Sequence, residues 1–172
     1  MCGSDGCYHP VSPRTDSSSR HPETQADLHL ALAELYTNSG DTTRALMELN
    51  SANGLEIPED LALRLREARA RTLDRSGDHE GAIQTWSDVL AAAGPGSIAA
   101  QAAPLAIADL HLRQGRIKEA DRQLQVVLTG RVDERIRGRA YLVSARIAEQ
   151  RDEMEAAIAA YRSVISITKL DE

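Results

Sequence analysis

Three series of residues recur along the chain at one shared spacing, and this internal repeat restricts the possible folds more than any other feature. Two of the series are alanines and the third is bulky, and all three advance in steps of 37, 38 and 37 residues: Ala33, Ala70, Ala108, Ala145; Ala45, Ala82, Ala120, Ala157; and Leu49, Trp86, Leu124, Tyr161. A period in this range is typical of architectures in which one supersecondary unit is stacked on copies of itself. We therefore predict four similar units over residues 24–170.

Each unit reads as two helices joined by a tight turn. An alanine in each helix allows the two helices to approach closely, and the bulky residue one helical turn further on fills the groove beside the contact. The turns contain Gly40, Gly77 and Gly115, since glycine can take the left-handed conformation that ends a helix. Asp41 and Asp78 follow as candidate caps of the next helix. The fourth turn, Gln150-Arg151-Asp152, has no glycine, so we expect this hairpin to be the least well specified.

The composition supports a helical chain. The 172 residues are 42% hydrophobic and 27% charged, which suits one globular domain. There is no Phe, one Trp and four Tyr, so apolar volume must come from small and aliphatic side chains. Strands favour aromatic and β-branched residues, which argues against an all-β fold. The predicted fold class is all-α, an α-solenoid of about four helix-turn-helix hairpins.

This pattern resembles the tetratricopeptide repeat, a helix-turn-helix with small residues at one place in each helix and a glycine at the turn. The best matches fall in the first two units: Leu32, Ala33, Tyr36, Gly40, Ala45, Leu49 and Ala52, then Ala70, Leu73, Gly77, Ala82 and Trp86. The family period is about 34 residues. We therefore place extra residues in the connections around Leu55–Pro58, Ala93–Ser97 and Thr129–Val132. Arg66 and Arg69 stand where the family has apolar residues.

The resemblance implies a non-catalytic scaffold that binds a partner on a concave surface lined by the first helix of each repeat. Carried onto this sequence, the groove comprises Leu30, Glu34, Thr37, Asn38, Arg64, Glu67, Arg71, Asp74, Arg75, Leu105, Asp109, Leu112, Arg113, Arg139, Leu142, Arg146, Glu149 and Gln150. Its principal candidates are Arg64, Arg71, Arg75, Asp109, Arg113, Arg139, Leu142 and Arg146. Family members that clamp chaperone C-termini use Lys and Asn, whereas the corresponding positions here are Leu30 and Glu34, so we do not predict that partner.

Charge is unevenly distributed along the repeats. Residues 21–60 contain eight acidic residues and one Arg, whereas residues 61–75 contain five Arg and two acidic residues, and residues 131–146 also contain five Arg and two acidic residues. An Arg-rich groove suits an acidic peptide or protein partner. The alternative is that these arginines are solvated or paired with neighbouring carboxylates.

The last helix predicts a second interface. Its apolar residues Ile158, Ile165, Ile167 and Leu170 have no following repeat to cover them. Solenoids need a polar cap at such an end. We therefore expect a homo-oligomer or a subunit of a larger complex.

Residues 1–23 are rich in Ser, Pro, Gly and Asp and read as a flexible tail. Cys2, Cys7 and His9 lie in this tail. Incidental thiols, a Cys2–Cys7 disulfide and a metal or cofactor clamp remain open alternatives, although zinc ligands are usually two to four residues apart. The corresponding alternative function is a metal- or cofactor-handling accessory protein. The chain could also be a mature lipoprotein that starts at Cys2, with Met1 added in front of it.

Other functional classes receive little support. The formal net charge is −6, which argues against sequence-independent nucleic-acid binding, and no apolar run could span a membrane. We expect a cytoplasmic protein without a cofactor. No nucleophile elbow, phosphate loop or zinc-protease motif is present, so we do not expect an enzyme. We expect His111 to pack in its helix rather than act as a base.

Overall fold

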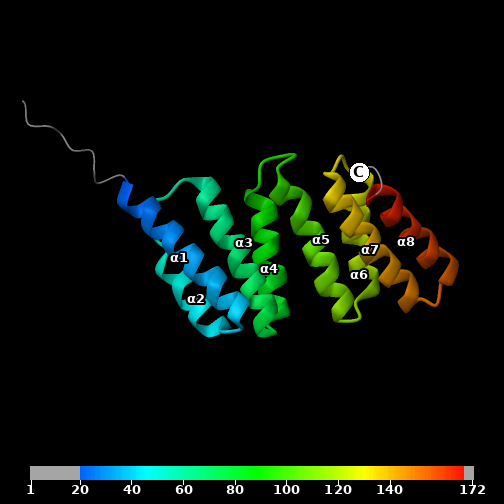
Figure 1. Ribbon diagram of the computed structural model, residues 1–172, viewed down its shortest axis with the longest axis horizontal. Helices are drawn as coiled ribbons and strands as arrows, with labels where there is room; N and C mark the ends of the chain where they lie inside the picture. Colours follow the sequence, from blue (N-terminus) through cyan, green and yellow to red (C-terminus); the bar gives the residue numbers. More distant parts are fainter. Residues whose placement is uncertain (1–19, 169–172) are drawn as a thin grey trace, which may run out of the picture.

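A computed structural model describes residues 20–168 of the chain, and they form eight helices in a row (Figure 1). The helices are α1 (Arg20–Ser39), α2 (Thr42–Ser51), α3 (Glu59–Ser76), α4 (His79–Ala92), α5 (Ile98–Arg113), α6 (Ile117–Thr129), α7 (Glu134–Gln150) and α8 (Met154–Thr168). No strand occurs among these residues. The predicted all-α solenoid of four hairpins is confirmed.

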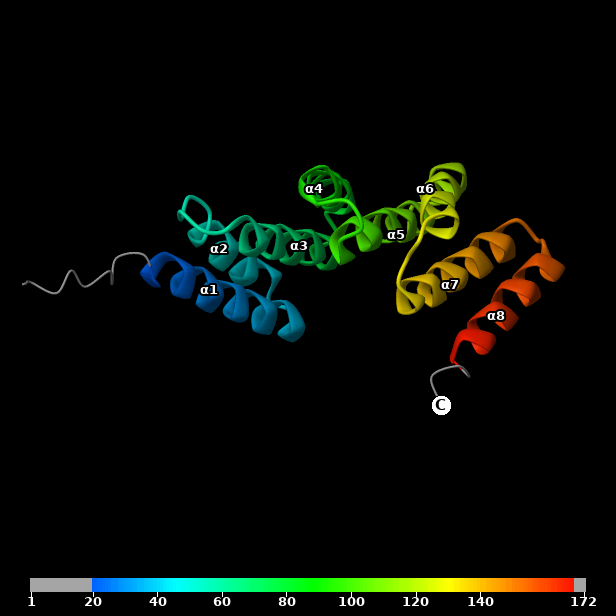
Figure 2. The same ribbon diagram turned by 90° about the horizontal axis from the view of Figure 1, so that it is seen from above.

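Successive helices pair as antiparallel hairpins, and the hairpins stack side by side. α1 packs on α2, α3 on α4, α5 on α6 and α7 on α8, and each second helix also packs on the first helix of the next hairpin. Figure 2 shows the row bending so that α1 and α7 incline toward the same side, while α4 and α6 lie on the outer side. The first helices therefore form the inner, concave layer.

The alanine register explains how closely the helices pack. Of the eight register alanines, seven are fully buried and Ala157 is 2% exposed. Leu49, Trp86 and Leu124 are buried beside them, as predicted, but Tyr161 remains 37% exposed. The difference arises because α3, α5 and α7 cover the first three bulky residues. In the described part of the chain no helix follows α8 to cover Tyr161 in the same way.

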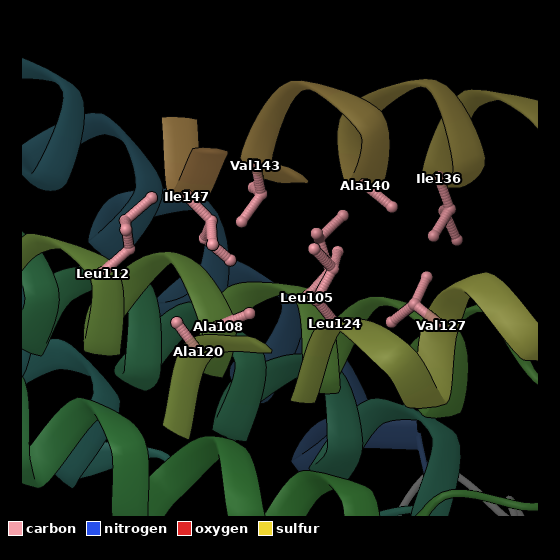
Figure 3. Close-up of a cluster of buried hydrophobic side chains, with 10 residues drawn as sticks. All are labelled: Leu105, Ala108, Leu112, Ala120, Leu124, Val127, Ile136, Ala140, Val143 and Ile147. Atoms are coloured by element: carbon pink, nitrogen blue, oxygen red, sulfur yellow. The ribbon is translucent and has the colours of Figure 1, made fainter. Parts of the chain in front are cut away.

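The apolar core is divided into three clusters of buried residues, one at each place where neighbouring hairpins meet. The cluster nearest the C-terminal end is shown in Figure 3, where Leu105 of α5, Leu124 of α6 and Ala140 of α7 converge. Because each cluster joins adjacent hairpins only, the stability of the solenoid depends on nearest-neighbour contacts.

The turns follow the predicted chemistry. Gly40, Gly77 and Gly115 have φ values of 88°, 89° and 72°, in the left-handed region. The carboxylate of Asp41 accepts a hydrogen bond from the backbone N–H of Arg44 at 3.1 Å, and that of Asp78 accepts one from Gly81 at 2.9 Å. In the fourth turn Asp152 occupies the glycine position with φ 58°. This residue therefore carries the strain that glycine avoids in the other three turns.

The connections between hairpins span residues 52–58, 93–97 and 130–133, where the sequence predicts the extra residues. α1 begins at Arg20, so helix starts before the predicted boundary at residue 24. The remainder of the proposed tail lies outside the described residues.

The joint between the second and third hairpins differs from the other two. α1 packs on α3 and α5 packs on α7, but α3 and α5 make no comparable contact among the described helices. α5 packs on α4 more extensively than α3 packs on α2 or α7 packs on α6. This separation leaves space on the concave face between α3 and α5.

A buried polar contact joins the first two repeats. The hydroxyls of Thr37 on α1 and Thr72 on α3 lie 2.8 Å apart and are both buried. Each hydroxyl also lies within hydrogen-bond distance of the carbonyl four residues earlier, so neither is left unsatisfied.

The fourth turn provides a test of the glycine argument. Replacing Asp152 with Gly removes the strain of a left-handed non-glycine residue, so we expect the free energy of unfolding to rise by about 0.5 kcal/mol. Gly77→Ala should lower it by about 1 kcal/mol, because alanine resists φ 89°. Gly94→Ala is the control, since Gly94 has an ordinary φ and open space around it. Urea unfolding measures all three, and a loss of stability in Asp152→Gly would contradict the argument.

The threonine pair can be tested by a double-mutant cycle. Thr37→Val and Thr72→Val should each lower the free energy of unfolding by about 1 kcal/mol, and the double variant should lose less than the sum. Thr85→Val is the matched control because its hydroxyl donates only to the carbonyl of Gly81. Strict additivity of the two losses in thermal or urea unfolding would show that the hydroxyls do not interact.

Candidate functional site

The helices α1, α3, α5 and α7 form the concave face of the solenoid (Figure 2). Three adjoining hollows are lined by residues of these helices. Arg71 lines both the first and the second hollow, and Asp109 and Arg139 line both the second and the third. The hollows thus form one continuous groove that crosses all four first helices.

The first hollow lies between α1 and α3 and has a volume of about 220 Å³. Its lining is polar apart from Ala68, and it includes Glu34, Asn38 and Arg75. Arg75 donates a hydrogen bond to the backbone carbonyl of Thr37 at 3.0 Å, so this guanidinium is held at the C-terminal end of α1. A positive charge at a helix C-terminus is favourable.

The central hollow lies where α3 and α5 are separated, and it has a volume of about 210 Å³. Trp86 from α4 contributes to its lining together with the small side chains of Ala102 and Ala106 on α5. The charged residues around it are Glu67, Arg71, Asp74, Asp109, Arg113 and Arg139. The hollow therefore combines an apolar surface with a charged surround, which is the usual chemistry of a binding site.

The third hollow lies between α5 and α7 and has a volume of about 240 Å³. Leu105, Leu142 and Val143 form its apolar part, and Arg146 stands beside it. Leu142 is 38% exposed, so it remains available for contact with a partner.

Seven of the eight principal groove residues predicted from the sequence line these hollows: Arg71, Arg75, Asp109, Arg113, Arg139, Leu142 and Arg146. Arg64 lies outside them and forms an exposed ion pair with Asp27 at 3.5 Å. The wider prediction was wrong for Leu30 and Leu112, which are 3% exposed and belong to the core. Thr37 and Leu105 are also buried, although they reach the base of a hollow.

A ladder of ion pairs connects successive first helices across the groove. Carboxylates of one repeat meet arginines of the next in three pairs: Glu34 with Arg71 at 4.0 Å, Asp74 with Arg113 at 2.7 Å, and Asp109 with Arg146 at 3.2 Å. Pairs within a helix add to the ladder, as Glu67 meets Arg71 and Asp109 meets Arg113. The hydrogen bond from Arg113 to Asp74 raises the pKa of the guanidinium.

The ladder changes the electrostatic character of the groove. Most of its arginines are already neutralised, in agreement with the alternative that they are paired with neighbours. Within the described part of the chain Arg139 has no hydrogen-bond or carboxylate partner, and it stands between the central and third hollows. Among the described residues, two guanidiniums without a carboxylate partner, those of Arg75 and Arg139, therefore remain of the Arg-rich groove expected from the sequence. The signal for the ladder was present in the sequence, since Glu34 and Arg71, and Asp109 and Arg146, are one repeat apart.

The predicted C-terminal interface is apolar and partly exposed. On α8, Ile158 is 45% and Ile165 is 53% exposed, whereas Ile167 is half-buried. Leu170 lies outside the described residues. The Tyr161 hydroxyl donates a hydrogen bond to Glu149 at 3.0 Å, and this bond raises the pKa of the phenol.

The remaining sequence candidates do not converge on a reactive site. Cys2, Cys7 and His9 lie outside the described residues, so the predicted metal or cofactor site and the associated accessory function stay predictions. Over residues 20–168 no group of three His, Cys, Asp or Glu side chains is placed to hold a metal ion. His111 is half-buried, and burial lowers the pKa of its imidazole. None of the helices in this range is both long and apolar enough to cross a membrane.

Comparison with known proteins agrees with this architecture. Residues 138–169 match the family model of the tetratricopeptide repeat, and this segment covers most of α7 and α8. No curated protein matches the chain. Repeats of this family generally mediate protein–protein interaction. The other three hairpins share the alanine register of the matched one, so each is similar to a tetratricopeptide repeat in the placement of its small residues.

Proposed function

We propose that the protein is a non-catalytic scaffold that binds a segment of a partner protein in the groove formed by the three hollows. The observation that carries this proposal is the continuity of the hollows, which share Arg71, Asp109 and Arg139 along the concave face. An extended polypeptide that follows this path meets alternating apolar and charged surface.

The chemistry of the hollows defines the partner segment. The central hollow offers Trp86, Ala102 and Ala106, and the third hollow offers Leu142 and Val143, so both accept apolar side chains. Arg139 stands between them, and no carboxylate of residues 20–168 pairs with it. A carboxylate from the partner would form a charge-assisted, two-point hydrogen bond with this guanidinium. The favoured segment therefore carries an acidic residue with apolar residues on both sides.

The proposal predicts that the groove selects such sequences from a random library. Peptides displayed on phage and selected on the wild-type protein should be enriched in an acidic residue flanked by apolar ones. Arg139→Glu should weaken the selected peptides by at least about tenfold, because it replaces attraction with repulsion. Ala106→Leu should weaken them similarly by filling the central hollow.

Arg122→Glu is the matched control, since Arg122 is an exposed arginine of α6 that lines none of the three hollows. Thermal unfolding of each variant separates loss of binding from loss of fold. Selected peptides that bind Arg139→Glu and Ala106→Leu as tightly as the wild type would place recognition outside the groove.

A further inference from the structure

The first and the last helix of the described solenoid, α1 and α8, both carry exposed apolar side chains. On α8 the exposed residues are Met154 at 66%, Ile158 at 45%, Tyr161 at 37% and Ile165 at 53%. On α1 they are Leu28 at 60%, Leu32 at 40% and Leu35 at 67%. Apolar stripes of this length are unusual on a surface that contacts only water.

In the repeat register, three residues of the stripe on α8 occupy the same positions as apolar residues of α6. Met154, Tyr161 and Ile165 lie 37 residues after Ile117, Leu124 and Leu128 of α6. In α6 these positions belong to the core cluster shared with α7, where Leu124 is 1% exposed and the other two are partly buried. The stripe on α8 is therefore the surface on which a following first helix would dock.

The stripe on α1 is the complementary surface. Leu28, Ala31 and Leu35 correspond in register to Ala140, Val143 and Ile147 of α7, which are 0%, 6% and 3% exposed. Figure 3 shows these α7 residues facing α5 and α6. The same positions are buried in α3, at Leu65, Ala68 and Thr72. On α1 they are exposed because no helix precedes α1 within the described residues.

The charged residues of the ion-pair ladder give the two ends of the solenoid charges of opposite sign. One register position reads Glu34, Arg71, Asp109 and Arg146, so the charge at this position alternates in sign from one repeat to the next. Glu34 pairs with Arg71 and Asp109 pairs with Arg146, whereas Arg71 and Asp109, both among the described residues, form no ion pair with each other. A second chain placed after α8 would continue this alternation, because its Glu34 would follow Arg146. The wider charges agree, since residues 21–60 have eight acidic residues against one Arg and residues 131–146 have five Arg against two. Two like ends would repel each other.

We propose that a second copy of the chain docks its α1 on α8 head to tail, with the helix packing that α6 and α7 show within one chain. The contact is heterologous, so each copy keeps one free end and further copies can add. In this assembly the concave groove continues from one copy to the next. The proposed self-association does not depend on the proposed peptide binding.

Two blocked variants test this arrangement. Met154→Asp with Ile165→Asp blocks the α8 surface, and Leu28→Asp with Leu35→Asp blocks the α1 surface. All four side chains are more than half exposed, so the fold should persist, which circular dichroism checks. Met47→Asp with Val126→Asp is the control, because both residues are exposed and apolar but lie on α2 and α6.

Light scattering across a concentration series measures the outcome. The wild type and the control should grow in mean mass with concentration, and each blocked variant should remain a monomer. An equimolar mixture of the two blocked variants should form a dimer and nothing larger, because one variant keeps its α1 surface and the other its α8 surface. Arg146→Glu in the variant that keeps α8 should weaken this dimer by about tenfold, and Glu34→Arg in the other should restore it.

Three results would overturn the proposal. The first is a wild-type monomer at about 100 µM, a concentration at which weak self-association is detectable by mass action. The second is a dimer formed by either blocked variant alone, which would indicate a contact between like ends. The third is growth of the mixture beyond a dimer.

Discussion

The close packing of two helices in every hairpin, with one buried alanine on each, is the constraint on which the rest of the structure depends. Four pairs of buried alanines bring the helices together, and larger side chains at these places would force the helices apart at a cost of about 1–3 kcal/mol each. The contact fixes which face of each helix points inward. Consequently it also determines which residues face the groove and which face the neighbouring hairpin.

The groove follows from a local departure from this regular packing. Because α3 and α5 do not pack closely, the small side chains of Ala102 and Ala106 leave a hollow that reaches Trp86 of the outer layer. The ladder of ion pairs around it is solvent-exposed, and exposed pairs contribute about 0–1 kcal/mol each. Their main effect is therefore on electrostatic pattern rather than on stability. They neutralise the arginines of the groove except Arg75 and Arg139, and they leave opposite charges at the two ends of the solenoid.

The sequence is sufficient to predict those features in which one residue type has one physical role. Spaced alanines and turn glycines predict helix pairing, register and the position of each turn, and the structure places them accordingly. The contacts of long side chains are harder to predict, because an arginine on a helix can reach solvent, a carboxylate in the next repeat or a backbone carbonyl. Arg113 and Arg75 show the last two outcomes. The buried position of Leu30 and Leu112 was missed because a groove helix turns some of its residues toward the second helix.

Trp86 allows a direct measurement of whether the central hollow receives the partner. It is the only tryptophan of the chain, it lines that hollow, and it is 6% exposed, so its fluorescence reports on this one place. Titration with a peptide selected on the wild-type protein should produce a saturable change in its emission, with the affinity obtained independently by calorimetry. A peptide that binds by calorimetry without altering the emission of Trp86 would contradict the assignment of the groove as the binding surface.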